Sequence, residues 1–156
     1  MRPRLEYCSA VWGGASPCLL SRLEKLQLQV ARAIARPRMP VAPSQLLASL
    51  GLPTLAWRRR IRRLVIFFNL HIGQGLPQLR KMLSNPASLR STRALRSAHG
   101  YAFPSSSTAR HLSSFLCTTI PEWNKLPASV VMCTTVSSFT SSLHILFSTD
   151  KFSLGL

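Results

Sequence analysis

Acidic residues are scarce in this 156-residue chain, which has twenty lysines and arginines against four carboxylates. The acids Glu6, Glu24, Glu122 and Asp150 are scattered, and Asp150 is the sole aspartate. A two-metal nuclease or polymerase site needs several carboxylates converging on two cations, and a glycosidase site needs a carboxyl pair. The sequence therefore predicts that the chain is not an enzyme on its own.

Metal-binding patterns and long apolar runs are also missing. The cysteines Cys8, Cys18, Cys117 and Cys133 contain no Cys-x-x-Cys pair, and the histidines complete no zinc pattern. We therefore predict no metal and no cofactor. The longest apolar run, 64–68, is too short to cross a bilayer, and the first residues lack the apolar core of a secretory signal. These absences predict an intracellular chain, nuclear or cytoplasmic, without a transmembrane segment.

Positive charge is what the chain has in excess. The formal net charge is +16, and sixteen of the twenty cations are arginines. Arginine makes bidentate contacts to phosphate and stacks on bases, whereas lysine acts as a point charge. This composition predicts a polyanionic partner. Two alternatives are a ribosomal or mitochondrial type of basicity, and a sequence never selected as a free-standing soluble protein.

Apolar periodicity predicts a mainly α fold: four to five short helices, an irregular segment rich in Ser and Arg, and a C-terminal helix. A short helix, or the end of a longer one, is expected over 3–12. A longer one should begin at Ser16-Pro17 and end at Pro37, because apolar residues recur at three- and four-residue steps at Leu19, Leu20, Leu23, Leu26, Val30 and Ile34. The next helix should begin at Pro43 and stop at Gly51.

The helix after it should be capped by Thr54 and run to about Ile72. Its predicted apolar stripe consists of Trp57, Ile61, Leu64, Val65, Phe68 and Ile72. Phe67 falls outside the stripe. Four arginines lie away from the stripe and Arg60 lies near its edge, so this helix should have a packed side and a guanidinium side.

The chain divides into a helical region over 1–84, a basic linker over 85–113 and a C-terminal segment over 114–156. The linker should be largely irregular, with a short strand possible at Tyr101 and Phe103. In the C-terminal segment Pro121 should open a helical turn that holds Trp123 as a packing anchor. The last helix, capped by Thr135, should carry one apolar side, made of Val136, Phe139, Leu143 and Leu146.

Two basic clusters are the candidate nucleic-acid-binding residues. The first comprises Arg58, Arg59, Arg60, Arg62 and Arg63, and the second comprises Arg90, Arg93 and Arg96. Guanidinium groups packed on less than two helical turns repel one another unless an anion neutralises them. The alternatives for the first cluster are a solvated face or a nuclear localisation run. For the second, nearby aromatics could stack on unpaired bases or simply pack on the domain.

Four blocks in order carry a family resemblance. They are Arg2-Pro-Arg-Leu-Glu-Tyr-Cys-Ser-Ala-Val-Trp12, then Leu23-Glu-Lys-Leu-Gln27, then Leu50-Gly-Leu-Pro-x-Leu55, and finally Ser114-Phe115, Thr119-Ile120, Trp123-Asn124, Leu126-Pro127 and Ser138-Phe139. Their order and spacing resemble the C-terminal part of the reverse transcriptase of non-LTR (LINE-type) retrotransposons, in the chicken-repeat and jockey-like groups. Departures include Leu28-Gln29, Thr140 and Ser142, where that family often has basic residues.

The resemblance implies a thumb and post-thumb fragment that grips RNA or an RNA–DNA duplex through arginine–phosphate contacts. The family's Asp-Asp active-site turn is absent, so no catalytic residue can be carried over, and the rest of the parent polymerase is absent too. Two alternatives stay open. One is a non-functional retroelement-derived fragment, and the other is a basic amphipathic targeting or membrane-surface segment centred on 54–72.

Overall fold

Nine helices form the part of the chain that this computed structural model describes, which is 6–37, 40–75, 77–83, 100–104 and 108–151. In chain order they are α2 (Ser9–Trp12), α3 (Pro17–Ala35), α4 (Pro43–Ser49), α5 (Leu55–His71), α6 (Pro77–Lys81), α7 (Ala109–Leu112), α8 (Phe115–Trp123), α9 (Ala128–Val131) and α10 (Val136–Leu146). The predicted mainly α fold is confirmed, and these ranges contain no strand.

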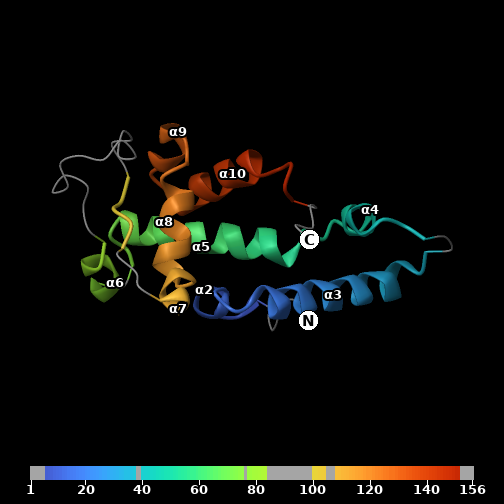
Figure 1. Ribbon diagram of the computed structural model, residues 1–156. Helices are drawn as coiled ribbons and strands as arrows, with labels where there is room; N and C mark the ends of the chain where they lie inside the picture. The colour runs from blue at the N-terminus through green and yellow to red at the C-terminus, as the bar shows by residue number, and fades with distance from the viewer. Residues whose placement is uncertain (1–5, 38–39, 76, 84–99, 105–107, 152–156) are drawn as a thin grey trace.

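Helix α5 is the centre of the molecule. It packs against α2, α3, α8 and α10, and Figure 1 shows it running between these elements. Its start is fixed as predicted, because the Thr54 hydroxyl accepts a hydrogen bond from the Trp57 amide at 3.2 Å. The predicted stripe is buried at Trp57, Ile61, Leu64 and Phe68, but so is Phe67, outside it. The helix is covered on more than one side and offers no continuous exposed apolar face.

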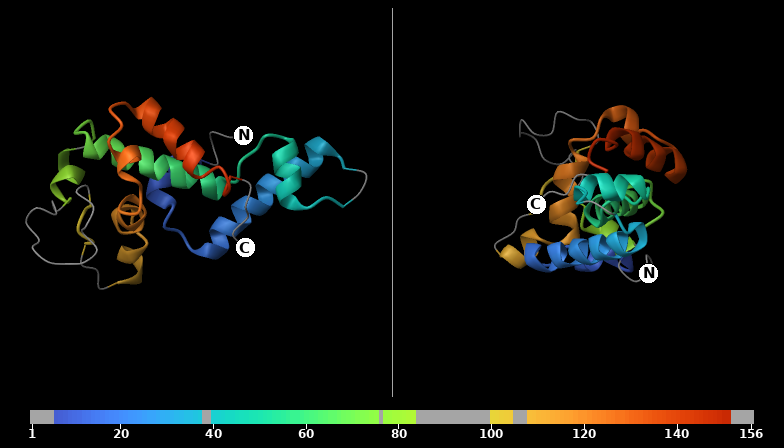
Figure 2. Two further views of the ribbon diagram at one scale, coloured as in Figure 1. Left: turned by 90° about the horizontal axis from the view of Figure 1, so that it is seen from above. Right: turned by 90° about the vertical axis from the view of Figure 1, so that its right-hand side faces the viewer.

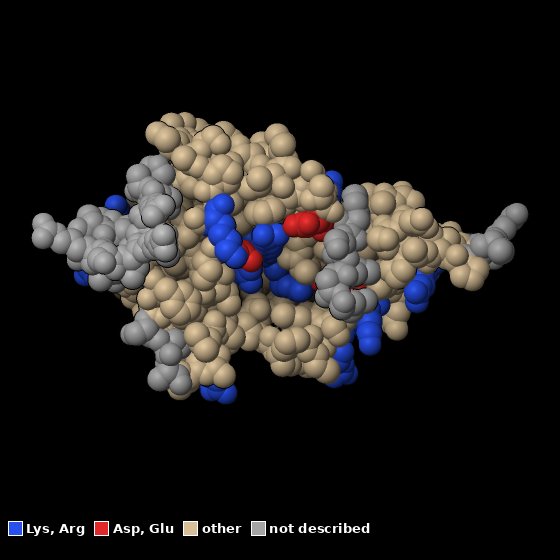
Figure 3. All heavy atoms as spheres, turned by 45° about the horizontal axis from the view of Figure 1, so that its top comes forward, with Lys and Arg blue, Asp and Glu red and all other residues tan. Residues whose placement is uncertain are grey.

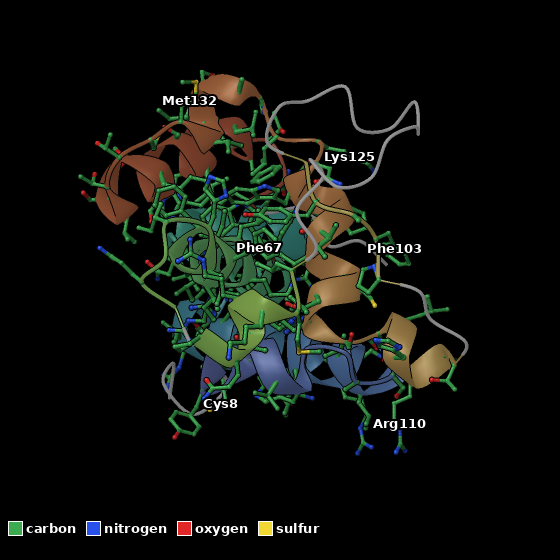
Figure 4. All side chains as sticks on the ribbon, turned by 90° about the vertical axis from the view of Figure 1, so that its left-hand side faces the viewer. Cys8, Phe67, Phe103, Arg110, Lys125 and Met132 are labelled. Atoms are coloured by element: carbon green, nitrogen blue, oxygen red, sulfur yellow. The ribbon has the colours of Figure 1, made fainter. Side chains whose placement is uncertain are left out.

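The main core joins α5 to the C-terminal helices. The Trp123 ring lies 4.8 Å from the Phe67 ring and 5.8 Å from the Phe139 ring, while Phe68 stacks on Phe139 at 4.2 Å. Figure 4 shows Phe67 in the middle of the packed side chains, with Met132 at the periphery. Trp123 is 1% exposed, which confirms it as a packing anchor. Residues more than fifty positions apart therefore share one core.

Helix α8 differs from its prediction. It begins at Phe115, six residues before Pro121, and the proline lies inside its last turn. A proline in that position removes one backbone hydrogen bond, but the preceding turns bury Leu116, Cys117 and Ile120, and this packing outweighs the loss. The short α7 also lies where an irregular linker was predicted. It is capped by Thr108, whose hydroxyl accepts a hydrogen bond from the His111 amide.

Helices α3 and α4 form an arm that extends away from the main core, as Figure 2 shows. Both helices have nearly the predicted limits, and Gly51 adopts the left-handed conformation, φ +60°, that ends α4. The arm has a small core of its own, made of Leu28, Ala31, Leu46 and Leu47.

The buried face of α3 is not its most apolar face. Glu24, Gln27, Leu28 and Ala31 point inward. Four of the aliphatic residues that established the helical period are instead exposed: Leu19 by 51%, Leu26 by 48%, Val30 by 41% and Ile34 by 63%. Polar anchoring explains this orientation, because the Gln27 amide donates a hydrogen bond to the Pro53 carbonyl at 2.9 Å and Glu24 caps α5. The sequence period predicted the helix but not the side that packs.

Asn124 secures the segment 100–104 to the end of α8. Its carboxamide accepts a hydrogen bond from the Tyr101 amide and donates one to the Tyr101 carbonyl, both at 2.9 Å. We expect Asn124→Ala to lower the free energy of unfolding by about 1–3 kcal/mol, because two half-buried backbone groups lose their partner. Urea denaturation checks this value, and amide exchange at Tyr101 should become faster. Asn69→Ala, within α5, is the matched control and should cost less than half as much.

Candidate nucleic-acid interface

The first arginine cluster lies on α5, where the four acidic residues of the chain come together from different segments. The nitrogen–oxygen distances are 2.7 Å for Arg58–Glu6, 3.2 Å for Arg59–Glu24, 3.0 Å for Arg60–Asp150 and 3.2 Å for Arg63–Glu122. Every carboxylate side chain in the sequence is thus paired with this cluster. In Figure 3 the blue and red side chains meet in the middle of one face. The acids that look scattered in the sequence are gathered by the fold.

The Arg59–Glu24 pair is the most buried of these contacts. Arg59 is 7% exposed and Glu24 is 8% exposed. Burial lowers the pKa of Arg59 from its ordinary value, and the Glu24 carboxylate opposes that shift. The same carboxylate accepts hydrogen bonds from the amides of Leu55, at 3.1 Å, and Ala56, at 2.6 Å. Glu24 therefore stabilises the positive N-terminus of α5 as well as a buried guanidinium.

The ion pairs of Arg60 and Arg63 are closer to solvent than the Arg59–Glu24 pair. Glu122 accepts hydrogen bonds from Arg63 through both carboxylate oxygens, and Arg60 Nε lies 3.6 Å from it, beyond hydrogen-bonding distance. The Arg60 guanidinium also lies 3.9 Å from the centre of the Phe147 ring, a cation–π contact. Asp150, its other partner, is half exposed. These contacts attach the segment after α10 to α5.

A hollow of about 390 Å³ opens beside the cluster, with Arg59, Arg60, Arg63, Glu122 and Asp150 in its wall. Its wall therefore carries three guanidinium groups and two carboxylates. This mixture is close to neutral, especially since Arg59 is already paired with Glu24. The hollow is not a strongly cationic phosphate pocket.

The predicted phosphate-binding face at 58–63 is therefore largely occupied from within the chain. Arg62 is the exposed member of the cluster, and its guanidinium donates a hydrogen bond to the Glu6 carbonyl at 2.8 Å. The solvated-face alternative is wrong for Arg59, which is buried. Sequence inspection missed this arrangement because each acid is distant in the chain from its arginine.

The second cluster, Arg90, Arg93 and Arg96, lies outside the described residues. Of the two aromatics grouped with it, Tyr101 packs edge-on against Phe67 at 5.3 Å. The Tyr101 hydroxyl is 2.8 Å from Nδ1 of His71, and burial raises the pKa of this tyrosine. Phe103 is 51% exposed. Tyr101 is thus a packing residue, whereas Phe103 has a face open to contact.

A further set of cations lies along α3, which we call the α3 cationic row: Arg22, Lys25, Arg32 and Arg36. All four are exposed. The spacing of three and seven residues places Arg22, Lys25 and Arg32 on one side of the helix, and Arg36 is the C-cap residue just beyond its end. Because all four acidic side chains of the sequence are paired at the α5 cluster, no Asp or Glu side chain remains to neutralise this row. The sequence does show this row, because its cations recur at helical spacing, but the consecutive arginines of 58–63 are more conspicuous.

Metal and membrane sites are not evident in the described ranges. No group of three or more His, Cys, Asp or Glu side chains there could hold a metal ion, and the four cysteines are free. None of the described helices combines the length and apolar character needed to cross a bilayer.

The fold and charge together define a small, strongly cationic α-helical protein whose acids neutralise one internal arginine cluster. No protein-family model, curated protein or solved structure matches this chain. Its function must therefore be argued from its own residues.

Proposed function

We propose that this chain is a catalytically incomplete piece of a non-LTR retrotransposon reverse transcriptase that binds RNA or an RNA–DNA duplex. The α3 cationic row is the main contact surface in this proposal, and Arg62 is a further exposed cation. One observation supports nucleic-acid binding at this row: all four acidic side chains are paired at the α5 cluster, so no Asp or Glu side chain is left as its counter-charge. A phosphate backbone supplies that counter-charge.

The length of the row suits a strand of nucleic acid. Arg22 and Arg36 are fourteen residues apart, which corresponds to about 21 Å along a helix axis. That distance covers several phosphates of one strand, whose charges are spaced along the whole backbone. Phosphate contacts orient a protein on its partner without reading sequence. The expected binding is therefore salt-dependent and largely independent of base sequence.

The residues behind the family resemblance are also consistent with the proposal. Glu24 and Gln27, in the second block, join α3 to the start of α5. Trp123 and Asn124, in the last block, fill the core and secure the segment 100–104. These positions determine the architecture, so similar blocks in the same order would produce a similar arrangement of helices.

Neutralising the row tests the proposal. The variant Arg22→Gln/Lys25→Gln/Arg32→Gln should bind structured RNA at least about tenfold more weakly at moderate salt. Each phosphate contact that is lost means that fewer counterions are released from the RNA on binding. The slope of log K against log salt should fall by about two to three. Fluorescence anisotropy over a salt series measures both quantities.

A matched variant separates a local surface from diffuse charge. Arg80→Gln/Lys81→Gln/Lys125→Gln removes the same number of exposed cations from α6 and the end of α8. It should weaken binding clearly less than the α3 variant. Equal weakening would rule out the α3 row as the main surface, and binding by the unaltered protein that ignores salt would contradict phosphate recognition altogether.

A further inference from the structure

We infer that the exposed apolar side of α3 docks an acidic amphipathic helix of a partner protein. This apolar row consists of Leu19, Leu23, Leu26, Val30 and Ile34. Four of these side chains are between 41% and 63% exposed, and Leu23 is half-buried. Aliphatic side chains aligned on one helix face differ from the isolated exposed leucines found on most surfaces. They mark a surface that a partner covers.

The spacing of the row fits a helix rather than a flat partner. Leu19, Leu23, Leu26 and Val30 alternate by four, three and four residues, and Ala33 continues the series. This is the a/d pattern of a coiled coil, in which each side chain enters a hole formed by four residues of the facing helix. The pattern covers about two heptads and stops with α3 at Ala35.

The described part of this chain does not fill that role. Helix α4 packs on the opposite side of α3, where Leu28 and Ala31 meet Leu46 and Leu47. The contact with α5 uses Glu24, on the same inward side. Among the described residues, therefore, nothing covers the apolar row, although the helix is fixed on its other face.

Charge decides which kind of helix fits. Arg22 lies at a g position beside the row, and the next g position is the uncharged Gln29. Arg36 follows as the C-cap residue just beyond α3, while the e side turns into the protein at Gln27. Residues at e and g select the partner of a coiled coil through ion pairs. The acids of this chain are all held at the α5 cluster, so a second copy would bring arginines together without counter-charge. A helix with Glu or Asp beside its apolar stripe fits both the apolar row and the arginines next to it.

This inference rests on the apolar row and does not require the proposed function. Lys25 and Arg32 lie farther round α3 and remain available to phosphate when the row is covered. The two surfaces can therefore be tested separately on the same protein.

The probe is a designed peptide of three heptads with Leu at a and d and Glu at e and g. The full chain should bind it, as measured by fluorescence anisotropy. An isomer with Lys at e and g should bind at least about tenfold more weakly, because it repels the arginines. A peptide with the same glutamates but Ser at a and d controls for attraction to the charge of the whole protein, and it too should bind at least about tenfold more weakly.

Substitutions on the protein provide the second arm. Leu26→Ser/Val30→Ser alters exposed side chains and should leave the protein folded. It should lower the affinity for the acidic peptide by about tenfold or more. Met132→Ser/Ile145→Ser, at other exposed apolar positions, should leave peptide binding unchanged. RNA binding by the Leu26→Ser/Val30→Ser variant should also stay unchanged. Failure of the helix-docking inference can therefore be told apart from failure of the proposed RNA binding.

Four results would overturn the inference. Two concern the peptides: the Ser-substituted peptide or the Lys peptide would bind the protein as tightly as the acidic peptide does. In the third, the protein would self-associate, and Leu26→Ser/Val30→Ser would abolish this self-association. In the fourth, the acidic peptide would fail to bind, and phosphatidylserine–phosphatidylcholine vesicles would capture the protein in a way that depends on the row. The last two would assign the row to a second copy or to a lipid surface.

Discussion

Replacing Glu24 with Gln is expected to lower the free energy of unfolding by about 3–5 kcal/mol, a large fraction of the stability of a domain this size. Glutamine keeps the shape of the side chain but removes its charge. The Arg59 guanidinium, 7% exposed, then remains buried without a carboxylate. The amides of Leu55 and Ala56 also lose a charged acceptor at the start of α5. Urea denaturation followed by circular dichroism measures the change.

Asp150→Asn is the matched control for this prediction. It removes the charge of a half-exposed partner of Arg60, and exposed ion pairs contribute less than about 1 kcal/mol. The double variant Glu24→Leu/Arg59→Met should recover only the part of the loss that comes from the unpaired guanidinium, because apolar replacement of a buried ion pair is often neutral. The part that comes from the Leu55 and Ala56 amides should remain, because leucine offers them no acceptor. If Glu24→Gln costs no more than Asp150→Asn, Glu24 does not hold the buried pair as described.

Replacing Trp123 with Ala is expected to lower the free energy of unfolding by about 3–5 kcal/mol. The indole is 1% exposed and contacts Phe67, Phe68 and Phe139, so its removal leaves a cavity between α5, α8 and α10. Chemical denaturation gives the magnitude. Loss of near-ultraviolet circular dichroism with retained helix content would indicate that the core packing fails first.

Trp123→Phe separates the volume of the side chain from its aromatic character. It keeps an apolar ring against the same neighbours and should cost less than half as much as Trp123→Ala. Met132→Ala, at a side chain 68% exposed, should have little effect. An alanine variant as stable as the unaltered protein would contradict the placement of Trp123 at the centre of the core.

The arginine cluster at 58–63 shows why charge alone is a poor guide to a binding surface. Neutralising these residues would remove the ion-pair partners of all four acids and destabilise the folded protein. A loss of RNA binding in such a variant would therefore not identify a phosphate contact. The α3 cationic row is the better test, because its side chains are exposed and their removal breaks no ion pair with a carboxylate.

Local patterns in the sequence determined much of the secondary structure. Prolines, the Thr54 cap and the three- and four-residue apolar steps predicted α3, α4, α5 and α10 with nearly the limits observed. These signals act within a few residues, so they can be recognised without the fold. The prediction failed at α8, where the burial of Leu116, Cys117 and Ile120 overrides the proline within its last turn.

Tertiary structure alone decided which faces are buried and which charges are free. The period of α3 was correct, yet Glu24 and Gln27 turn inward because their partners at 53–56 are supplied by another part of the chain. In the same way, Glu6 and Asp150 find their arginines across more than fifty residues. The sequence by itself determined the helices α3, α4, α5 and α10 and the excess of positive charge. The pairing of each acid, and hence the cations left for a partner, depends on contacts that no local pattern encodes.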